Sequence, residues 1–415
     1  MKIGYYLSLL TLATPVFAKP SFELLHWWTA KGEQAALSVI EDQFINSPIR
    51  LINDSIAGGG GSPAKTILQA RAIAGNLPNI AQMEGPAIQS WAALGFLHNV
   101  NTIARSQDWD NVLYPEVQSI HQFAENYVAV PINIHRLNWM WVNTSILKQH
   151  HVDIPKDWDS LIMAFRELKK RGIPPIALGN EQWQVVQLFE NIAYGVGGAD
   201  YYRRAFVNLE PDALKSKHTE KALKRFRTIS NLVGSELMTM KWDQGTQSLL
   251  NGEVAFQLTG DWALAEILST QRTMPSHIEC ITFPSTENGF IYNIDSLAFF
   301  KTQQAHSEEL EYIISSISNP DFLLEFNKKK GSIPAQKNIP VHSLSHCQQK
   351  SYHDFNAARK LGTAMPSFID SMAVNPTIQN AVSNELFQYF NDSTITDDAL
   401  ISHLSVFSSN IPNRP

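Results

Sequence analysis

The chain has 415 residues, of which 44% are hydrophobic and 17% are charged. This composition indicates an ordered globular protein, and the length exceeds what one hydrophobic core usually supports, so we expect two domains. The formal net charge of -6, without any long run of Lys or Arg, excludes a basic surface for nucleic acid or an anionic membrane.

The first 18 residues have the pattern of a signal peptide. Lys2 precedes an apolar run over residues 3–12, and the short side chains of Val16 and Ala18 suit a signal peptidase. The apolar run is too short to span a bilayer, so we expect cleavage after Ala18. No cysteine follows that point, which argues against a lipid anchor, and the mature chain should be soluble and exported.

The chain contains two cysteines, Cys280 and Cys347, without CxxC or Cys/His metal spacing. The oxidising compartment that export implies favours a disulfide over two buried thiols. A bridge would close a loop of about 66 residues and stabilise the fold by on the order of 4 kcal/mol.

The first predicted strand, residues 22–28, organises the rest of the mature chain. It is a nearly continuous apolar run that ends in Trp27 and Trp28, as in a strand covered on both faces. Because neighbouring side chains point to opposite faces, one of these tryptophans should lie at the strand end. A polar turn leads to Glu33, where a helix is predicted over residues 33–44. Strands and helices continue to alternate, which predicts an α/β fold.

A glycine run, Gly58 to Gly61, follows the second predicted strand, residues 50–56. Ser62 and Pro63 are the expected N-cap and first residue of the next helix. The spacing fails both the phosphate-loop and the dinucleotide-loop patterns. The run is therefore either a flexible turn or bare backbone that lets a ligand or an adjoining segment approach closely.

Glu84 follows a predicted strand over residues 77–83. The carboxyl ends of strands in open α/β sheets form the edge at which ligands bind. Glu84 is thus a candidate ligand contact, and the alternative is a solvated turn glutamate.

Further along, residues 127–143 are rich in strand formers and are predicted to cross between the two domains. Trp183, with its neighbour Gln184, and Trp262 are candidate stacking platforms, although a single tryptophan is more often part of a core. The predicted strand over residues 290–300 carries Asn293 and Asp295 on one face. Polar side chains in such an apolar strand cost free energy unless they are paired, so they contact a ligand or brace the hinge. The histidines are scattered, which gives no support for a metal site.

These motifs together resemble the family-1 extracellular solute-binding proteins, the periplasmic components of sugar ABC transporters, and within them the glucose- and mannose-binding group. The resemblance covers essentially the whole mature chain. It rests on His26-Trp27-Trp28-Thr29, Gly58 to Gly61, Gly85-Pro86 with Ile88-Gln89, residues 130–136, residues 195–200, Gly260-Asp261-Trp262, residues 293–296, residues 330–334 and Pro366-Ser367. Cys280 and Cys347 also fall where the family has its cysteine pair.

The resemblance implies a type II-like periplasmic binding protein fold, with two α/β lobes, hinge crossings and a ligand cleft between the lobes. The implied lobes are residues 19–131 plus 290–333 and residues 132–289 plus 334–415. A pyranose offers an apolar C–H face to aromatic rings and a rim of hydroxyls to polar groups. The family's stacking residues correspond to Trp27, Trp28 and Trp262, and its polar contacts to Glu33, Asn293, Asp295 and Lys330.

The resemblance also implies a periplasmic binding protein and not an enzyme, with no cofactor and no metal. Its partners would be the sugar and the permease subunits of an ABC transporter, and presentation of the sugar to a chemoreceptor is compatible with this role. Nothing in the sequence indicates oligomerisation, so a monomer is expected.

Two departures from the resembled group concern the cleft. Glu84 replaces a lysine that the glucose-binding members carry just before Gly-Pro, and Asp370 replaces a histidine that follows their Pro-Ser. Both changes put an acceptor in place of a donor, so the cleft becomes more acidic. An ammonium group on the ligand would gain charged partners, each worth about 1.5–3 kcal/mol. We therefore hypothesise an amino sugar, or an oligosaccharide that contains one.

Two alternatives remain open at this point. In the first, Glu84 pairs with Lys330 and the site takes a neutral mono- or disaccharide of the glucose or mannose type. In the second, the chain is a secreted glycoside hydrolase, which also combines tryptophans with carboxylates.

Overall fold

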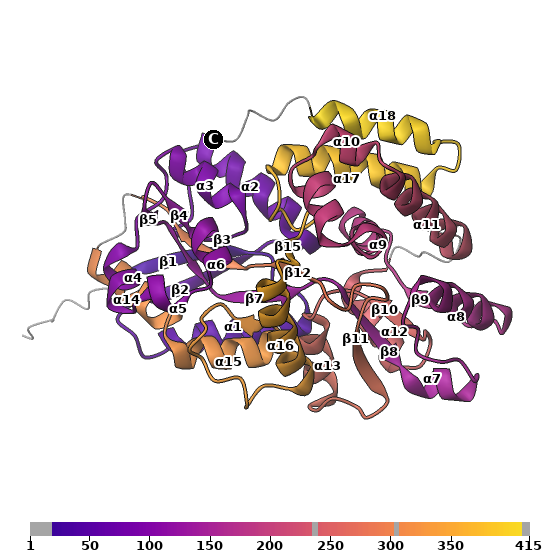
Figure 1. Ribbon diagram of the computed structural model, residues 1–415. Coiled ribbons are helices and arrows are strands. Elements are labelled where there is room, and N and C mark those ends of the chain that lie inside the picture. The colour runs from indigo at the N-terminus through magenta and orange to yellow at the C-terminus, as the bar shows by residue number, and fades with distance from the viewer. Residues whose placement is uncertain (1–18, 235–239, 303–306, 409–415) are drawn as a thin grey trace, which may run out of the picture.

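The computed structural model describes residues 19–234, 240–302 and 307–408 (Figure 1). The predicted signal peptide lies outside the described residues. The described chain forms two lobes, each built on its own β-sheet, with a third sheet between them.

The first lobe is built on a five-stranded sheet in the order β2-β1-β3-β13-β6. Its strands are β1 (Ser21–His26), β2 (Arg50–Ser55), β3 (Ile80–Met83), β6 (Ala129–Pro131) and β13 (Ser296–Phe299). Strand β1 is parallel to β2 and β3, whereas β13 is antiparallel to both β3 and β6. The loops after β1 and β3 therefore leave the same edge of the sheet.

The helices of the first lobe lie on both faces of this sheet (Figure 1). They are α1 (Lys31–Phe44), α2 (Ser62–Ile73), α3 (Pro86–Ala93), α4 (Asn101–Ser106), α5 (Trp109–Val112), α6 (Pro115–His121), α14 (Ser307–Ile317) and α15 (Pro320–Lys330), with a short hairpin of β4 (Gln122–Phe123) and β5 (Asn126–Tyr127). Leu37, Ile40 and Phe44 of α1 are buried, as the helical spacing predicted.

The second lobe is built on a four-stranded sheet in the order β11-β8-β10-β9. Its strands are β8 (Trp139–Asn143), β9 (Ile176–Ala177), β10 (Phe256–Leu258) and β11 (Ile278–Thr282). Its helices are α7 (Thr144–Gln149), α8 (Trp158–Lys170), α9 (Gln182–Tyr202), α10 (Pro211–Leu214), α11 (Lys217–Val233), α12 (Trp242–Leu250), α13 (Ala263–Gln271), α17 (Pro376–Asn391) and α18 (Asp397–Ser408), with a π-helical turn over Arg203–Val207. The predicted N-cap at Asp157 is confirmed, since its carboxylate accepts the Ser160 N–H.

The third sheet joins the lobes in the order β14-β7-β12-β15. It consists of β7 (Asn133–Arg136), β12 (Phe290–Asn293), β14 (Ile333–Pro334) and β15 (Ala364–Pro366), and α16 (His346–Leu361) lies against it. Strands β6, β7 and β8 follow one another through the first, third and second sheets, which confirms the predicted crossing at residues 127–143.

Three local predictions are wrong. The strand predicted for residues 22–28 ends at His26, so Trp27 and Trp28 both follow it. The single strand predicted for residues 290–300 is broken at Ile294 and Asp295, because β12 belongs to the third sheet and β13 to the first. At this break, the backbone N–H of Asp295 donates to the side-chain oxygen of Asn133, and the backbone carbonyl of Asp295 accepts the N–H of Ile132. The N-cap of α2 is Gly61 rather than Ser62, because Gly61 adopts a φ of 70° and the helix begins one residue earlier than predicted.

The lobe boundaries drawn from the resemblance stay a proposal. The boundary between the lobes is least clear at helix α16, which was assigned to the second lobe. Phe355 and Ala358 of this helix pack in the same core cluster as Leu24 of β1, which belongs to the first lobe. Cys347, at the start of α16, packs instead in a cluster with Trp141 of the second lobe.

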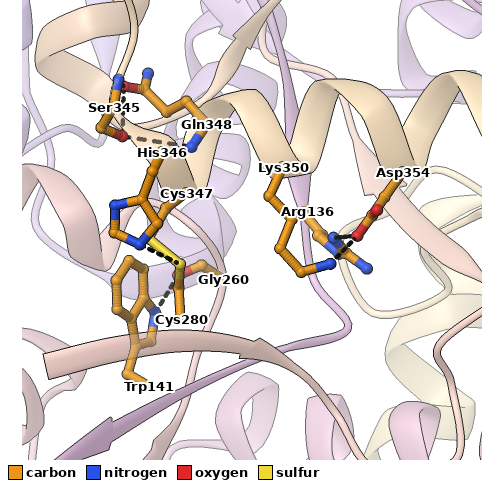
Figure 2. The surroundings of a disulfide bond; sticks show 10 residues. All are labelled: Arg136, Trp141, Gly260, Cys280, Ser345, His346, Cys347, Gln348, Lys350 and Asp354. Carbon is orange, nitrogen blue, oxygen red and sulfur yellow. Dashed lines mark hydrogen bonds and ion pairs between the residues drawn. A yellow bond between two sulfur atoms is a disulfide. The ribbon is translucent and has the colours of Figure 1, made fainter.

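The predicted disulfide is confirmed (Figure 2). It joins Cys280 of β11 to Cys347 of α16, with Cα atoms 6.1 Å apart, and so fastens the second lobe to the helix that covers the third sheet. The side chain of His346 lies 3.5 Å from one sulfur and 3.6 Å from the other. Trp141, close to the bridge, donates its indole N–H to the carbonyl of Gly260. Among the described helices, none is long and apolar enough to cross a bilayer.

The disulfide generates the first prediction. The variant Cys280→Ser/Cys347→Ser should lose about 4 kcal/mol of unfolding free energy, because the bridge no longer restricts a long loop in the unfolded chain. Urea unfolding of the variant and of the oxidised wild type measures the difference. Reductant should lower the wild-type midpoint and leave the variant unchanged. Equal midpoints for oxidised wild type and variant would contradict a stabilising role.

Candidate ligand-binding site

A cavity lies between the lobes. Every predicted ligand-binding residue except Gln184 lines it. The lining residues are Trp27, Trp28, Thr29, Glu33, Gly59, Gly60, Glu84, His135, Trp183, Trp242, Trp262, Asn293, Asp295, Lys330 and Asp370. Gln184 is buried behind the cavity, where its side chain accepts the Gly179 N–H and donates to Glu181. Gln184 therefore stabilises the start of α9.

Aromatic rings form much of the cavity wall. Trp27 and Trp28 directly follow β1, while Trp183, Trp242 and Trp262 lie at or next to the starts of α9, α12 and α13. The rings of Trp183 and Trp262 are 6.0 Å apart. Indole rings from both lobes thus face one space, and such rings can stack on the apolar face of a sugar.

Two of these indoles pack closely on the backbone of the glycine run. A Cβ atom on Gly59 would lie 2.4 Å from Trp183, and one on Gly61 would lie 2.6 Å from Trp27. The expectation that an adjoining segment approaches the bare backbone is therefore confirmed.

Glu33 forms an ion pair with Lys330 inside the first lobe. Its Oε1 lies 3.0 Å from the Lys330 ammonium, and its Oε2 accepts the N–H groups of Thr29 and Ala30. The same ammonium lies 5.6 Å from the centre of the Trp28 ring. Glu33 and Lys330 therefore neutralise each other beside the aromatic wall.

Glu84 has a different partner from the one considered in the sequence. Its Oε2 lies 2.7 Å from the ammonium of Lys65 on α2, and its Oε1 accepts the Asn293 amide at 2.8 Å. The pairing of Glu84 with Lys330 is thus wrong. Burial raises the pKa of Glu84, and the ammonium of Lys65 offsets part of that rise.

Lys65 is a site residue that the sequence did not reveal. Besides Glu84, its ammonium contacts the carbonyl of Gly60 and, at 3.4 Å, the hydroxyl of Ser371. It also lies 5.2 Å from the centre of the Trp27 ring. Its position in the first turn of a helix that begins at the cavity is the signal that could have identified it.

His135 of β7 is a second site residue that the sequence did not reveal. Its Nδ1 contacts Asp261 and its Nε2 lies 3.2 Å from Asp295. Burial opposes a charge on the ring, but the two carboxylates outweigh burial and raise the pKa of His135 to about 9. Asp295 also accepts the side-chain amides of Gln82 and Asn133. Burial opposes the charge of Asp295, but the hydrogen bond and charge of His135, with Lys330 and Asn133, outweigh burial and lower its pKa.

Asp370 is the exception among the acidic side chains of the cavity. It is 6% exposed and lies in the loop after β15, held there by a hydrogen bond from its N–H to the Ser367 hydroxyl. Within the described part of the chain, its carboxylate has no hydrogen-bond or ion-pair partner. Burial and the negative charges of Glu84 and Glu190 raise its pKa well above the ordinary value.

The loop that carries Asp370 packs on the turn after Glu84. A Cβ atom on Gly85 would lie 2.0 Å from the carbonyl oxygen of Ser371, and Gly85 has a φ of 52°. Glycine at position 85 therefore lets the Asp370 loop approach Glu84 from the other side of the cavity.

The potential metal ligands that lie together in the described residues are Cys280, His346 and Cys347. Both cysteines are consumed in the disulfide, so this cluster offers no thiolate to an ion.

Comparison with known proteins gives a match to the family model of bacterial extracellular solute-binding proteins over residues 54–303. A probable sugar-binding periplasmic protein of Brucella suis biovar 1 is 32% identical over 382 residues, which cover 92% of this chain and 90% of that protein. Another, of Rhizobium meliloti, is 31% identical over 393 residues and 95% of both chains.

Solved structures with the same fold include a chitin oligosaccharide binding protein, with a TM-score of 0.80 at 17% identity over 94% of this chain and 98% of that one. Maltose-bound T. maritima MalE3 gives a TM-score of 0.72 at 14% identity over 94% of this chain and 99% of that one. These similarities confirm the predicted two-lobe fold.

The raised pKa of His135 predicts a pH-dependent stability. Since the folded pKa of about 9 exceeds the ordinary value of roughly 6.5, the stabilisation is complete below about pH 6.5 and is lost as the pH rises through 9. The stability difference between wild type and His135→Gln should therefore shrink by on the order of 3 kcal/mol between pH 6 and 9.5.

Urea unfolding of both proteins across this range measures the difference. His342→Gln, at an exposed histidine, is the control and should track the wild type. A difference between wild type and His135→Gln that stays constant with pH would refute a charged His135.

Proposed function

The chain belongs to the bacterial extracellular solute-binding proteins, and from this we propose that its ligand is an amino sugar or an oligosaccharide that contains one. At the coarser level it is a periplasmic sugar-binding protein of an ABC transporter, consistent with its family and relatives. These are solute-binding proteins and not enzymes, which sets aside the glycosidase alternative. We propose further that the protein acts as a monomer towards the permease, with a chemoreceptor as a second partner.

The observation that carries the amino-sugar proposal is the unpaired carboxylate of Asp370. Glu33 and Glu84 each have a lysine partner, and Asp295 and Asp261 share the charge of His135. A buried charge without a partner is costly, and a ligand ammonium placed beside Asp370 would remove that cost. The aromatic wall supports a pyranose ring as the carrier of the ammonium, with Trp27 and Trp262 as its stacking partners.

The remaining predicted contacts complete the proposed site. Lys330 would donate to ring hydroxyls, while Glu33 and Asp295 would accept from them. Asn293 would also accept, because its amide N–H donates to Glu84 and its buried Oδ1 has no partner among the described residues. Trp28 and Trp183 would close the apolar side. Glu84, already bound to Lys65 and Asn293, would act on the ligand mainly through its charge.

A neutral sugar is the second candidate, and a specific observation favours it. Because the pKa of Asp370 is raised, the protonated carboxyl can donate a hydrogen bond to a hydroxyl without any ammonium on the ligand. Both candidates use the same side chain in opposite protonation states, so they predict opposite pH dependences.

Calorimetric titration of the purified protein with glucose, mannose, glucosamine and N-acetylglucosamine distinguishes the candidates. Glucosamine should bind about 10- to 150-fold more tightly than glucose, because one or more charge-assisted hydrogen bonds form. N-acetylglucosamine has a similar ring without the charge and should bind no better than glucose. Tight glucose binding without any gain from the amine would rule out an amino-sugar ligand.

Asp370→Asn tests the residue itself. The variant should lose about tenfold or more in glucosamine affinity, since the carboxylate partner is gone. Asp212→Asn, at an exposed position, is the matched control. Wild-type glucosamine affinity should rise as the pH rises through the pKa of Asp370, until the amine itself loses its proton. Affinity for a neutral sugar should fall over the same range, because it requires the protonated carboxyl.

Asp370→Asn with unchanged glucosamine affinity, or a wild-type affinity for glucosamine that falls with rising pH near that pKa, would contradict the assigned role. Glu84→Gln gives a separate test: unchanged amine binding in that variant would remove Glu84 from the electrostatics of the site.

A further inference from the structure

A second cavity adjoins the first across Trp183. It is lined by residues of the glycine run, of α2, α9 and α17, and of the Asp370 loop. Its lining residues come from both lobes, as those of the first cavity do. A molecule bound there would therefore also lie between the lobes.

The partition between the two cavities is thin. Trp183, Gly59 and Gly60 line both cavities, so the wall consists of one indole and a stretch of glycine backbone. Trp183 is only partly buried, and its indole N–H donates to Glu181 at 3.1 Å.

The chemistry of the second cavity differs from that of the first. Among the described residues that line it there is no carboxylate, whereas the first cavity holds Asp370. Its polar lining consists of amides, hydroxyls and one ammonium: Gln69, Gln182, Gln379, Asn380, Ser62, Thr66, Ser371 and Lys65. Amides and hydroxyls donate and accept equally, which suits the hydroxyl groups of an uncharged sugar.

Two of these amides are free to bind. Gln69 of α2 and Asn380 of α17 have no side-chain hydrogen-bond partner among the described residues, and both are exposed. They stand on helices of different lobes. A sugar unit in the cavity could accept and donate hydrogen bonds to both helices at once, with Trp183 as its apolar wall.

We propose that the second cavity is a subsite for an uncharged sugar unit, linked to the unit that occupies the first cavity. The preferred ligand is then at least a disaccharide whose two units lie on either side of Trp183. This proposal rests on the proposed function, because the first unit must occupy the cavity at Asp370.

Titration of the purified chain with mono- and disaccharides tests the subsite. The probes are glucosamine, the disaccharides that join glucosamine to N-acetylglucosamine in either order through α-1,4, β-1,4 or β-1,6 bonds, glucose, maltose and cellobiose. At least one disaccharide should bind about tenfold or more tightly than its own monosaccharide. The variant Gln69→Ala/Asn380→Ala should lose most of that gain and keep the wild-type affinity for the monosaccharide. Gln43→Ala, an exposed glutamine of α1, is the control.

If a monosaccharide binds and no disaccharide binds more tightly, the subsite is refuted while the proposed function stands. The subsite is equally refuted if the double variant leaves the disaccharide gain intact or weakens both ligands alike. Absence of binding by every probe would refute the proposed function, and the subsite with it.

Discussion

The imidazolium of His135 between Asp261 and Asp295 is the interaction on which the arrangement of the two lobes depends. The three residues come from β7, from the turn before α13 and from the break between β12 and β13, so they join the third sheet to both lobes. Arg136, the next residue on β7, donates its backbone N–H to Asp261. Buried carboxylates are costly unless paired, so the charge of His135 sets where these segments can lie. Trp262 and Asn293, their neighbours in the chain, are positioned in the cavity as a result.

Other buried carboxylates of the cavity are paired with cations in the same way, whereas Asp370 is not paired with any described residue. Each lysine partner comes from the same lobe as its carboxylate: Lys330 with Glu33, and Lys65 with Glu84. The carboxylates Glu33 and Glu84 of the first lobe are thus neutralised by lysines of the same lobe and need no ligand for this. Asp370 enters from a loop whose neighbours Phe368 and Ile369 pack in the core of the second lobe. No cation of the second lobe pairs with its carboxylate in the described part of the chain.

The sequence predicted those parts of the site that depend on local structure. Trp27, Trp28 and Glu84 could be identified because they lie at or next to the ends of predicted strands, and the carboxyl ends of parallel strands meet at one edge of the sheet. Lys65 and His135 could not, because their roles come from contacts 19 and 126 residues away along the chain. The break at Asp295 was also hidden, since Ile294 continues the apolar pattern while the hydrogen-bond partners change from one sheet to the other.

The charge arrangement ties ligand choice to closure of the lobes. A ligand can shift the balance between open and closed forms only by its difference in affinity for the two. Ion pairs that lie within one lobe, such as Lys65–Glu84, are present in either form and add nothing to that difference. Because Asp370 and Glu84 come from different lobes, closure would bring the two carboxyls together, and the negative charge of Glu84 is one cause of the raised pKa of Asp370. A proton or a ligand ammonium at Asp370 would relieve the repulsion between them only when the lobes are together. Asp370, whose carboxylate has no partner among the described residues, would therefore make closure depend on the ligand in the proposed site.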